Sequence, residues 1–380
     1  MNPTLFYLIA GACISFMIGR VAIPRIILIA KRKRIFDTPN PRKIHTQQIP
    51  RLGGVSFLPG MLIAYFLIRG IQCTIGGNGM PDVETIYQET IFYFFTGLIT
   101  IAAVGLWDDI IGLTYKYKLL VQLFVALLLV LPAGRIVNLE GIFGIYAIPD
   151  WMSTPLTVLI VMVVINAFNL IDGLDGLAAG LAIVSSCCMA IWFLIGGGNP
   201  AGAVCMLIMA GACLGFLRYN FHPARIFLGD TGSTFIGLIF AVIGLSTIDR
   251  VVTFTSLLLP LLAVGVPLFD VCLAIWRRST RKLLNPEAGG IMDGDQDHLH
   301  HRLLRQTRKQ TTAALMMYLL ACLFSAVALA FLLLRDSAPA IAYMILLVAV
   351  VICVRRLAVV ELYDSAELIK RGLSKPHRGC

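Results

Sequence analysis

The sequence predicts an all-α membrane protein whose chain crosses the bilayer about eleven times. The 380-residue chain is 58% hydrophobic and only 14% charged, and its mean hydropathy is +0.85. This composition excludes a water-soluble globular protein. Apolar runs recur along the whole chain, and each can cross about 30 Å of hydrocarbon as a helix.

The predicted spans follow one another with short polar connections. In chain order they are residues 4–29, 54–70, 91–106, 118–133, 155–171, 174–195, 201–217, 234–248, 256–276, 313–334 and 340–354. Because the basic cluster Lys31–Arg34 follows the first apolar run, this run is an anchor and not a cleaved signal peptide. We therefore expect one transmembrane catalytic domain over residues 1–355 and a basic cytoplasmic tail over residues 356–380.

The net charge of +10 indicates an orientation. If the amino terminus lies outside, most of the 31 Lys and Arg residues fall in loops on the inner side. The carboxyl terminus is then cytoplasmic, and anionic membrane lipids are expected neighbours of the basic loops. We expect no nucleic acid partner, because these charges follow one membrane face without interleaved aromatic residues. The ten cysteines lie mostly in apolar spans without CxxC spacing, so neither a zinc site nor a disulfide framework is expected.

Unusual polar side chains gather at the predicted cytoplasmic ends of the spans. Charged groups in or near lipid are functional by default, because burying them is costly. We therefore predict an active site at the cytoplasmic face, built from five groups: Arg42–Gly54, Trp107–Asp109, Asn166–Gly176, Arg218–Ser233 and His298–Arg302.

The acidic groups predict a magnesium site. Carboxylate and amide oxygens suit this hard cation, which usually shares one or two protein carboxylates with substrate phosphates. Mn²⁺ is the expected substitute. The candidate oxygen donors are Asp108, Asp109, Asp172, Asp175, Asp230, Asn169 and Asn220. A transition metal on His298-Leu-His300-His301 is the weaker alternative, because His298 and His300 point apart if the segment is extended.

The basic groups predict phosphate recognition. Arg302 follows three histidines, and loops with Lys43, His45, Arg218 and Arg225 lie on the same predicted side. Gly229–Ser233 opens a span, so free backbone N–H groups there can bind an anionic oxygen. Phosphate-binding cations beside a magnesium-type acidic set point to cleavage or formation of a diphosphate.

These motifs resemble the polyprenyl-phosphate N-acetylhexosamine-1-phosphate transferases, relatives of the phospho-MurNAc-pentapeptide translocase. The resemblance runs from Asp37 to Arg302 and covers five ordered motifs. Asp108-Asp109 matches the family's aspartate pair, residues 166–178 match NxxNxxDGxDGLA, and residues 220–233 match NxxPAxxFxGDxGS. One departure is Gly112, where many relatives carry the third aspartate of DDxxD.

The resemblance implies a role for each matching residue. Asp230 with Asn169 would bind magnesium, and Asn220, Phe227 and Asp175 would surround the uracil. Asp108, with Asp109 beside it, would act on the acceptor as base or positioning group. The run His298, His300, His301 and Arg302 looks like the phosphate- and sugar-side loop of the GlcNAc-type branch. The site residues predicted here are therefore Asp108, Asp109, Asp172, Asp175 and His300 as catalytic groups; Lys43, His45, Asn220, Phe227, His298, His301 and Arg302 for substrate; and Asp230 and Asn169 for metal.

The implied reaction transfers GlcNAc-1-phosphate, or a related N-acetylhexosamine-1-phosphate, from a UDP-sugar to undecaprenyl phosphate in the bacterial inner membrane. UMP leaves, and the lipid-diphosphate-sugar starts a cell-envelope polysaccharide such as the O-antigen of lipopolysaccharide. The alternatives are the phospho-MurNAc-pentapeptide translocase, which differs in its sugar-side loop, and an ion-coupled transporter, which would carry its charges near mid-membrane. The sequence leaves open the sugar, the pathway and whether the chain forms a homodimer.

Overall fold

The computed structural model describes residues 3–37, 48–75, 84–133, 135–136, 148–195, 200–245, 251–252, 260–284 and 298–334, together with 345, 348, 349 and 352. Almost all of these residues are helical, so the predicted all-α class is confirmed. Lys43, His45 and the predicted tail 356–380 lie outside the described residues.

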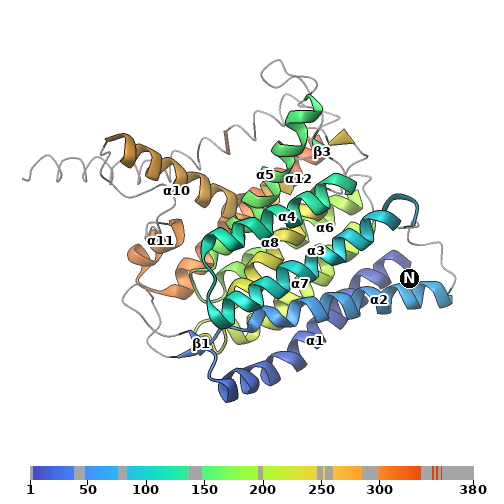
Figure 1. Cartoon of the computed structure of the whole chain (residues 1–380), viewed down its shortest axis with the longest axis horizontal. Coiled ribbons are helices and arrows are strands. Elements are labelled where there is room, and N and C mark those ends of the chain that lie inside the picture. The colour runs from blue at the N-terminus through green and yellow to red at the C-terminus, as the bar shows by residue number, and fades with distance from the viewer. Residues whose placement is uncertain are drawn as a thin grey trace, which may run out of the picture. The chain divides into compact units, whose positions relative to one another are not determined.

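Long helices make up the described chain (Figure 1). They are α1 (Pro3–Lys33), α2 (Phe57–Ile75), α3 (Glu84–Ile111), α4 (Tyr115–Ala133), α5 (Asp150–Ile171), α6 (Leu177–Ile195), α7 (Pro200–Asn220), α8 (Gly229–Leu245), α10 (Gly265–Leu284), α11 (Leu299–Thr307) and α12 (Gln310–Leu334). A 3₁₀ turn, η1 (Gly53–Ser56), precedes α2. Two short strand pairs accompany the helices: β1 (Phe36–Asp37) is antiparallel to β2 (Ile49–Pro50), and β3 (Arg135–Ile136) is parallel to β4 (Val251–Val252).

The described helices follow the order of the predicted spans. Ten of the predicted spans each overlap one helix, and the eleventh, 340–354, falls mostly outside the described residues. Seven helices are long and apolar enough to cross a membrane, namely α1, η1 with α2, α3, α5, α6, α7 and α12, and two shorter apolar helices are Gly229–Leu245 and Gly265–Trp276. The chain is therefore a multi-pass membrane protein.

Small residues bring the helix backbones together around α8. A Cβ added to Gly105 of α3 would lie 2.5 Å from Thr231 Cα, and one added to Gly237 would lie 2.6 Å from Ile165 Cα in α5. These close approaches need glycine, which membrane helix interfaces favour. Apart from Asp230, α8 is buried along its whole length. It is the central helix that carries Asp230 to the site.

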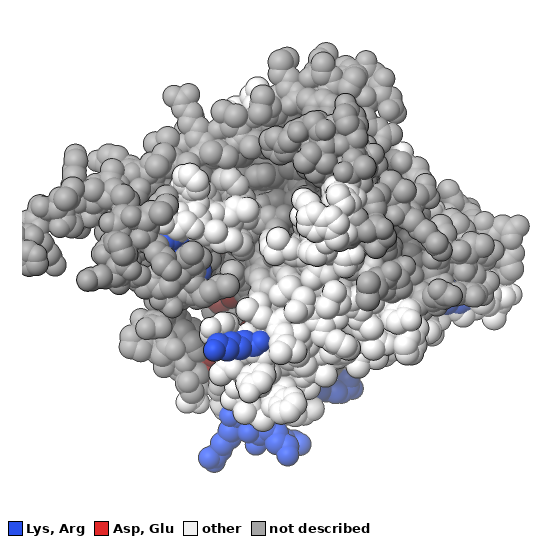
Figure 2. Space-filling model, turned by 45° about the horizontal axis from the view of Figure 1, so that its top comes forward, with Lys and Arg blue, Asp and Glu red and all other residues white. Residues whose placement is uncertain are grey.

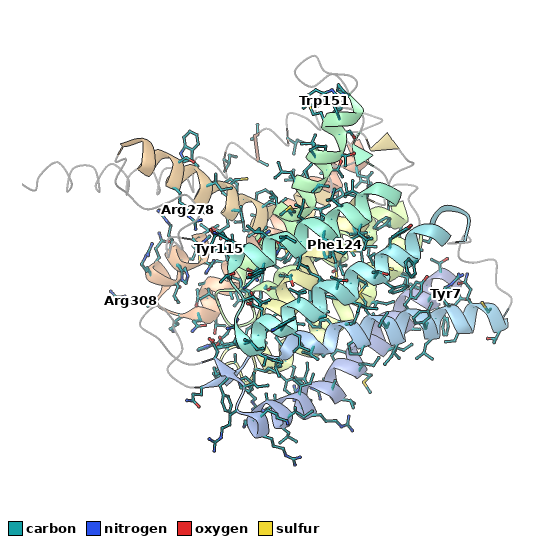
Figure 3. The ribbon with its side chains drawn as sticks, viewed as in Figure 1. Tyr7, Tyr115, Phe124, Trp151, Arg278 and Arg308 are labelled. Carbon is teal, nitrogen blue, oxygen red and sulfur yellow. The ribbon has the colours of Figure 1, made fainter. Side chains whose placement is uncertain are left out.

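The helix ends that carry the polar motifs gather at one end of the helix bundle. In Figure 3, Tyr115 at the start of α4, Arg278 of α10 and Arg308 after α11 lie toward the left, whereas Tyr7 and Trp151, near the starts of α1 and α5, lie toward the right and the top. In Figure 2 most visible Lys and Arg atoms lie along the lower edge, and the described face above them is largely uncharged. The first compact unit of the chain, which ends at Ala326, contains all described residues of the predicted site; a second unit starts at Val327.

Candidate active site

Asp109 holds the start of α8. Its Oδ1 accepts the N–H of Asp230 at 2.8 Å, and its Oδ2 accepts the N–H of Thr231 at 3.0 Å and the Thr231 hydroxyl at 2.6 Å. The free N–H groups of a helix start attract an anion, and here the Asp109 carboxylate is that anion. The structure therefore gives Asp109, which we predicted to be catalytic, a contact that orients the neighbouring Asp230.

Asp108 and Asp230 converge on one cation. The Lys118 ammonium, in the first turn of α4, lies 2.5 Å from Asp108 Oδ2 and also contacts Asp230 Oδ2. Arg51 approaches from the other side, 3.6 Å from Asp230 Oδ1 and 3.5 Å from Asp109 Oδ1. Burial alone would lower the pKa of Arg51, but the carboxylates around it raise that pKa above its usual value. Asp108, Asp109 and Asp230 thus form an acidic cluster whose negative charge is partly balanced by Lys118 and Arg51.

Gly112 ends α3 and explains the departure from the DDxxD pattern. It adopts a φ of +80°, and its N–H donates to the Asp108 carbonyl at 2.8 Å. Glycine is the usual residue at this left-handed position after a helix. The N–H of Leu113 then donates to Asp108 Oδ1 at 2.6 Å. The turn after α3 therefore fixes the Asp108 side chain, and an aspartate at position 112 would be strained there.

The loop between α5 and α6 carries Asp172 and Asp175. The pKa of Asp172 rises to about 8 because its side chain is buried and because Asp230 and Asp109 add negative charge nearby. Asp175 is held differently: its Oδ2 accepts from His222 Nδ1 at 2.7 Å and from the N–H of Ala224 at 3.1 Å. Asp172 is therefore a group that keeps its proton at neutral pH, whereas Asp175 ties this loop to the segment after α7.

Asn220 and Phe227 shape the segment between α7 and α8. Asn220 is buried; its Oδ1 accepts the Gly176 N–H at 2.9 Å and its Nδ2 donates to the Ile226 carbonyl at 2.9 Å. Phe227 pairs through its backbone with Pro50 and Gly53, at 2.7 and 2.9 Å. Both residues therefore hold the loops of the site together, and uracil recognition by them stays a prediction.

The histidine segment forms the first turn of α11 and the residue before it. His298 and His300 stack with ring centroids 5.7 Å apart, and His300 and His301 are 4.3 Å apart. A Cβ added to Gly173 would lie 2.2 Å from His300 Nε2, so His300 reaches the α5–α6 loop. Burial and the neighbouring His300 and His298 lower the pKa of His301 to about 4. His301 is therefore a neutral hydrogen-bonding group at neutral pH, whereas the predicted role assumed a cationic loop.

We assigned no individual role to three charged residues at the site, although Arg51 lies within the predicted group Arg42–Gly54. Lys118 and Arg51 look like ordinary basic residues of the inner face, and only the three-dimensional contacts pair them with the aspartates. Asp270 lies in α10, where it contacts His298 at 3.0 Å. A lone carboxylate inside a predicted apolar span was the sequence signal that could have revealed it.

The acidic cluster fits magnesium in its chemistry. Asp108 and Asp230 already share one cation, and Asn169 donates its Nδ2 to Ser233 Oγ at 2.9 Å, which leaves its oxygen as a further ligand. Within the described ranges, no group of three or more His, Cys, Asp or Glu residues could hold a metal ion by itself. Two carboxylates completed by phosphate oxygens and water are the usual magnesium set.

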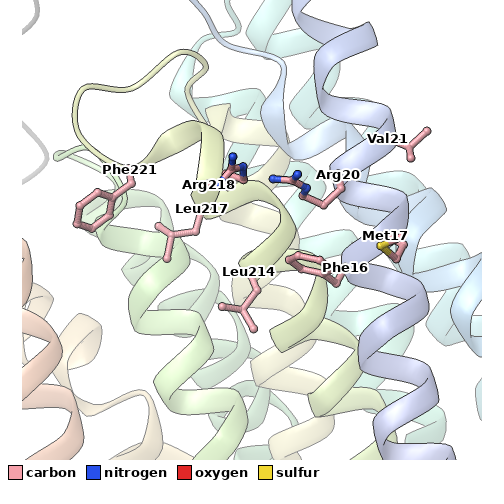
Figure 4. Close-up of a pocket in the computed structure, with 8 residues that line it drawn as sticks. All are labelled: Phe16, Met17, Arg20, Val21, Leu214, Leu217, Arg218 and Phe221. Atoms are coloured by element: carbon pink, nitrogen blue, oxygen red, sulfur yellow. The ribbon is translucent and has the colours of Figure 1, made fainter.

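A separate groove lies between α1 and α7 (Figure 4). Its volume is about 910 Å³, and it is lined by Phe16, Met17, Arg20, Val21, Leu214, Leu217, Arg218 and Phe221. These lining residues include no carboxylate, so the groove is distinct from the acidic cluster. Leu217 and Phe221 also lie against Gly176, at 3.1 and 3.3 Å from an added Cβ, which brings one edge of the groove next to the α5–α6 loop.

Comparison with known proteins identifies the family. The model of glycosyl transferase family 4 matches residues 91–248, the part of the chain that contains the aspartate pair, the α5–α6 loop and the start of α8. A probable undecaprenyl-phosphate N-acetylglucosaminyl 1-phosphate transferase of Bacillus subtilis is 32% identical over 86% of this chain and 85% of that protein. The chain belongs to this family. It is a polyprenyl-phosphate sugar-1-phosphate transferase.

Two further relatives represent the GlcNAc type and the pentapeptide type of transferase. A decaprenyl-phosphate N-acetylglucosaminephosphotransferase of Mycobacterium leprae is 31% identical over 77% of this chain and 75% of that protein. A phospho-N-acetylmuramoyl-pentapeptide-transferase of Thermosynechococcus vestitus is 33% identical over 64% of each chain. The GlcNAc-type relatives therefore align with more of this transferase than the pentapeptide type does.

Proposed function

We propose that the transferase moves GlcNAc-1-phosphate from UDP-GlcNAc to undecaprenyl phosphate at the cytoplasmic face of a bacterial inner membrane. An oxygen of the lipid phosphate attacks the β-phosphorus of the donor, and the bond from that phosphorus to the bridging oxygen breaks. UMP leaves with the bridging oxygen, and the lipid-diphosphate-sugar starts a cell-envelope polysaccharide. The alignment with two GlcNAc-type relatives over more than three quarters of the chain supports this choice of sugar.

The single observation that carries the proposal is the convergence of Asp108 and Asp230 on one cation, with His300 against the neighbouring α5–α6 loop. Two anionic substrates repel each other, so a site that joins them needs fixed positive charge. Lys118 and Arg51 balance most of the charge of the acidic cluster. Arg302, in the turn of α11 that carries His300, is the further cation that we assign to the donor phosphates.

The contacts of each residue suggest its role in the reaction. Magnesium, held by Asp230 and the oxygen of Asn169, would supply charge neutralisation at the diphosphate. Asp109 and the turn at Gly112 orient the two carboxylates. The acceptor phosphate has a second pKa near ~6, so it is already largely ionised at cytoplasmic pH. Asp108 therefore orients the acceptor and takes a proton only from its minority protonated form.

The test incubates membranes that contain the transferase with radiolabelled UDP-sugars, undecaprenyl phosphate and Mg²⁺. We expect lipid-linked label from UDP-GlcNAc, release of UMP, loss of transfer on chelation and its return with Mg²⁺ or Mn²⁺. If label appears in the lipid only with another UDP-sugar, that sugar and not UDP-GlcNAc is the donor. If no UDP-sugar gives labelled lipid, the proposal is refuted.

The pentapeptide donor decides between the two branches of the family. A site that hydrogen-bonds particular sugar substituents rejects a donor that leaves its buried polar groups unpaired. We expect essentially no product from UDP-MurNAc-pentapeptide with the purified protein. Efficient transfer from it would make this chain a phospho-MurNAc-pentapeptide transferase.

A further inference from the structure

Asp270 is a buried carboxylate in an apolar helix. It lies in the second turn of α10, within the apolar stretch Gly265–Trp276, and is 1% exposed. A charged group at such a position is costly unless it is paired. Its partners therefore indicate what the residue is for.

Within the described part of the chain, the polar contacts of Asp270 go to the start of α11. Its Oδ1 accepts the Leu299 N–H at 2.7 Å, and its Oδ2 accepts the Nδ1–H of His298 at 3.0 Å. Leu299 is the first residue of α11, and the N-cap residue His298 makes no side-chain cap bond. An anion at a helix start satisfies free N–H groups and complements the helix dipole. Asp270 therefore supplies the missing cap from another helix.

The same carboxylate orients the histidines. A carboxylate can only accept, so its contact places the proton of His298 on Nδ1 and directs Nε2 away from Asp270. His300 Nδ1 lies 3.7 Å from the same oxygen and has no hydrogen-bond partner among the residues that the structure describes, although His300 is 1% exposed. The opposite edge of the His300 ring meets Gly173. Asp270 thus faces the Nδ1 edges of the two stacked imidazoles. Their opposite edges point away from Asp270, and the opposite edge of His300 faces the loop that carries Asp172 and Asp175.

We propose that Asp270 is a positioning residue for the donor: it fixes the start of α11 and the orientation of His298 and His300, so that the His298–Arg302 turn presents a rigid set of polar groups to the sugar diphosphate. This role rests on the proposed function. It requires that Asp270 act through His298 and not through the acidic cluster of Asp108 and Asp230.

The test compares Asp270→Asn, His298→Gln and the double variant in purified protein. The asparagine keeps the shape and one acceptor oxygen but loses the charge and turns a donor toward His298. We expect the KM for the UDP-sugar to rise at least about tenfold, the size of one lost charge-assisted hydrogen bond, while the KM for undecaprenyl phosphate stays the same. Because both changes break one contact, the double variant should be no worse than the worse single variant.

Control measurements distinguish a loss of positioning by Asp270 from a general loss of folding. Ser185→Ala removes another buried side-chain bond to the segment before α10, from Ser185 Oγ to the Ala263 carbonyl, and should leave both KM values unchanged. Thermal unfolding checks each variant. If Asp270→Asn does not fold, His298→Gln alone must show the donor-specific rise. Normal donor kinetics in a folded variant, or additive losses in the double variant, would overturn the role of Asp270.

Wild-type protein in the same assay keeps the two proposals apart. If wild-type protein forms product and the variants have an unchanged KM for the UDP-sugar, only the proposed role of Asp270 is refuted. The dissociation constant for UDP-GlcNAc, measured without the lipid acceptor, is the second readout and needs no turnover. If wild-type protein neither transferred the sugar phosphate nor bound UDP-GlcNAc, both the proposed function and this role of Asp270 would be refuted.

Discussion

At the scale of single residues, the aspartates that look alike in the sequence have different jobs. Asp109 caps α8, Asp175 binds the segment after α7, and Asp108 and Asp230 share Lys118. Sequence motifs predicted that these residues belong to one site. They could not divide the roles, because each role depends on which helix end or loop lies opposite the carboxylate.

Asp230→Asn is expected to lower transfer by orders of magnitude. The change keeps the shape but removes the charge that faces Lys118 and Arg51 and that would bind a divalent cation. Initial rates in membranes over a magnesium series measure the effect. Asp37→Asn is the matched control, because Asp37 pairs with the same Arg51 at 3.5 Å from outside the acidic cluster. Near-normal turnover of Asp230→Asn at ordinary magnesium would remove Asp230 from the metal site.

His301 is expected to make the protein sensitive to acid. Its pKa is about 4 in the folded chain and about 6.5 when unfolded, so the unfolded state binds more protons between these values. The folded state therefore loses stability as the pH falls from about 6.5 toward 4. His301→Gln should lose less thermal stability than wild type between pH 7 and pH 5 in detergent. Equal losses in the two proteins would show that His301 is not the source.

At the scale of elements, hydropathy predicted the helices but not all of their ends. Span 234–248 begins earlier in the structure, at Gly229, because Asp109 caps a polar first turn that a hydropathy window passes over. Span 256–276 is helical at residues 260–263 and again from Gly265, and this second helix continues to Leu284, past the apolar residues. Hydropathy measures the match to lipid, whereas a helix continues as long as its backbone bonds are favourable. Asp270 was missed for the same reason, since its window is apolar on average.

Gly54→Ala is expected to separate η1 from α8 and to inactivate the protein. The added Cβ would lie 2.1 Å from Gly232 N, a backbone atom that cannot move aside without shifting the start of α8 and Asp230. Gly70→Ala in α2 is the matched control, because its added Cβ meets nothing within 4 Å, and there alanine favours the helix by up to about 1 kcal/mol. Unfolding temperature and transfer rate should both fall for Gly54→Ala only. Full activity of Gly54→Ala would show that this contact does not position Asp230.

At the scale of the whole molecule, the polar motifs meet because alternate helices carry them to the same end of the bundle. Contacts between Gly53 and Phe227, between Asp109 and Thr231, and between His300 and Gly173 join segments far apart in the chain. Counting spans from the sequence was enough to predict this gathering. The contacts that hold it together depend on small residues and helix caps, which a count of spans does not contain.

The orientation of the transferase in the membrane is the last expectation, with the site and the carboxyl terminus cytoplasmic and the amino terminus outside. Cys73 is exposed near the end of α2 and Lys33 is exposed at the basic end of α1, beside the site end of the bundle. Starting from a variant without other cysteines, one protein would keep Cys73 and a second would carry Lys33→Cys with Cys73 replaced. Because basic loops stay inside, a membrane-impermeant maleimide should label Cys73 in intact cells and label Lys33→Cys only after the inner membrane is opened. The reverse pattern would place the active site outside, away from any cytoplasmic nucleotide sugar.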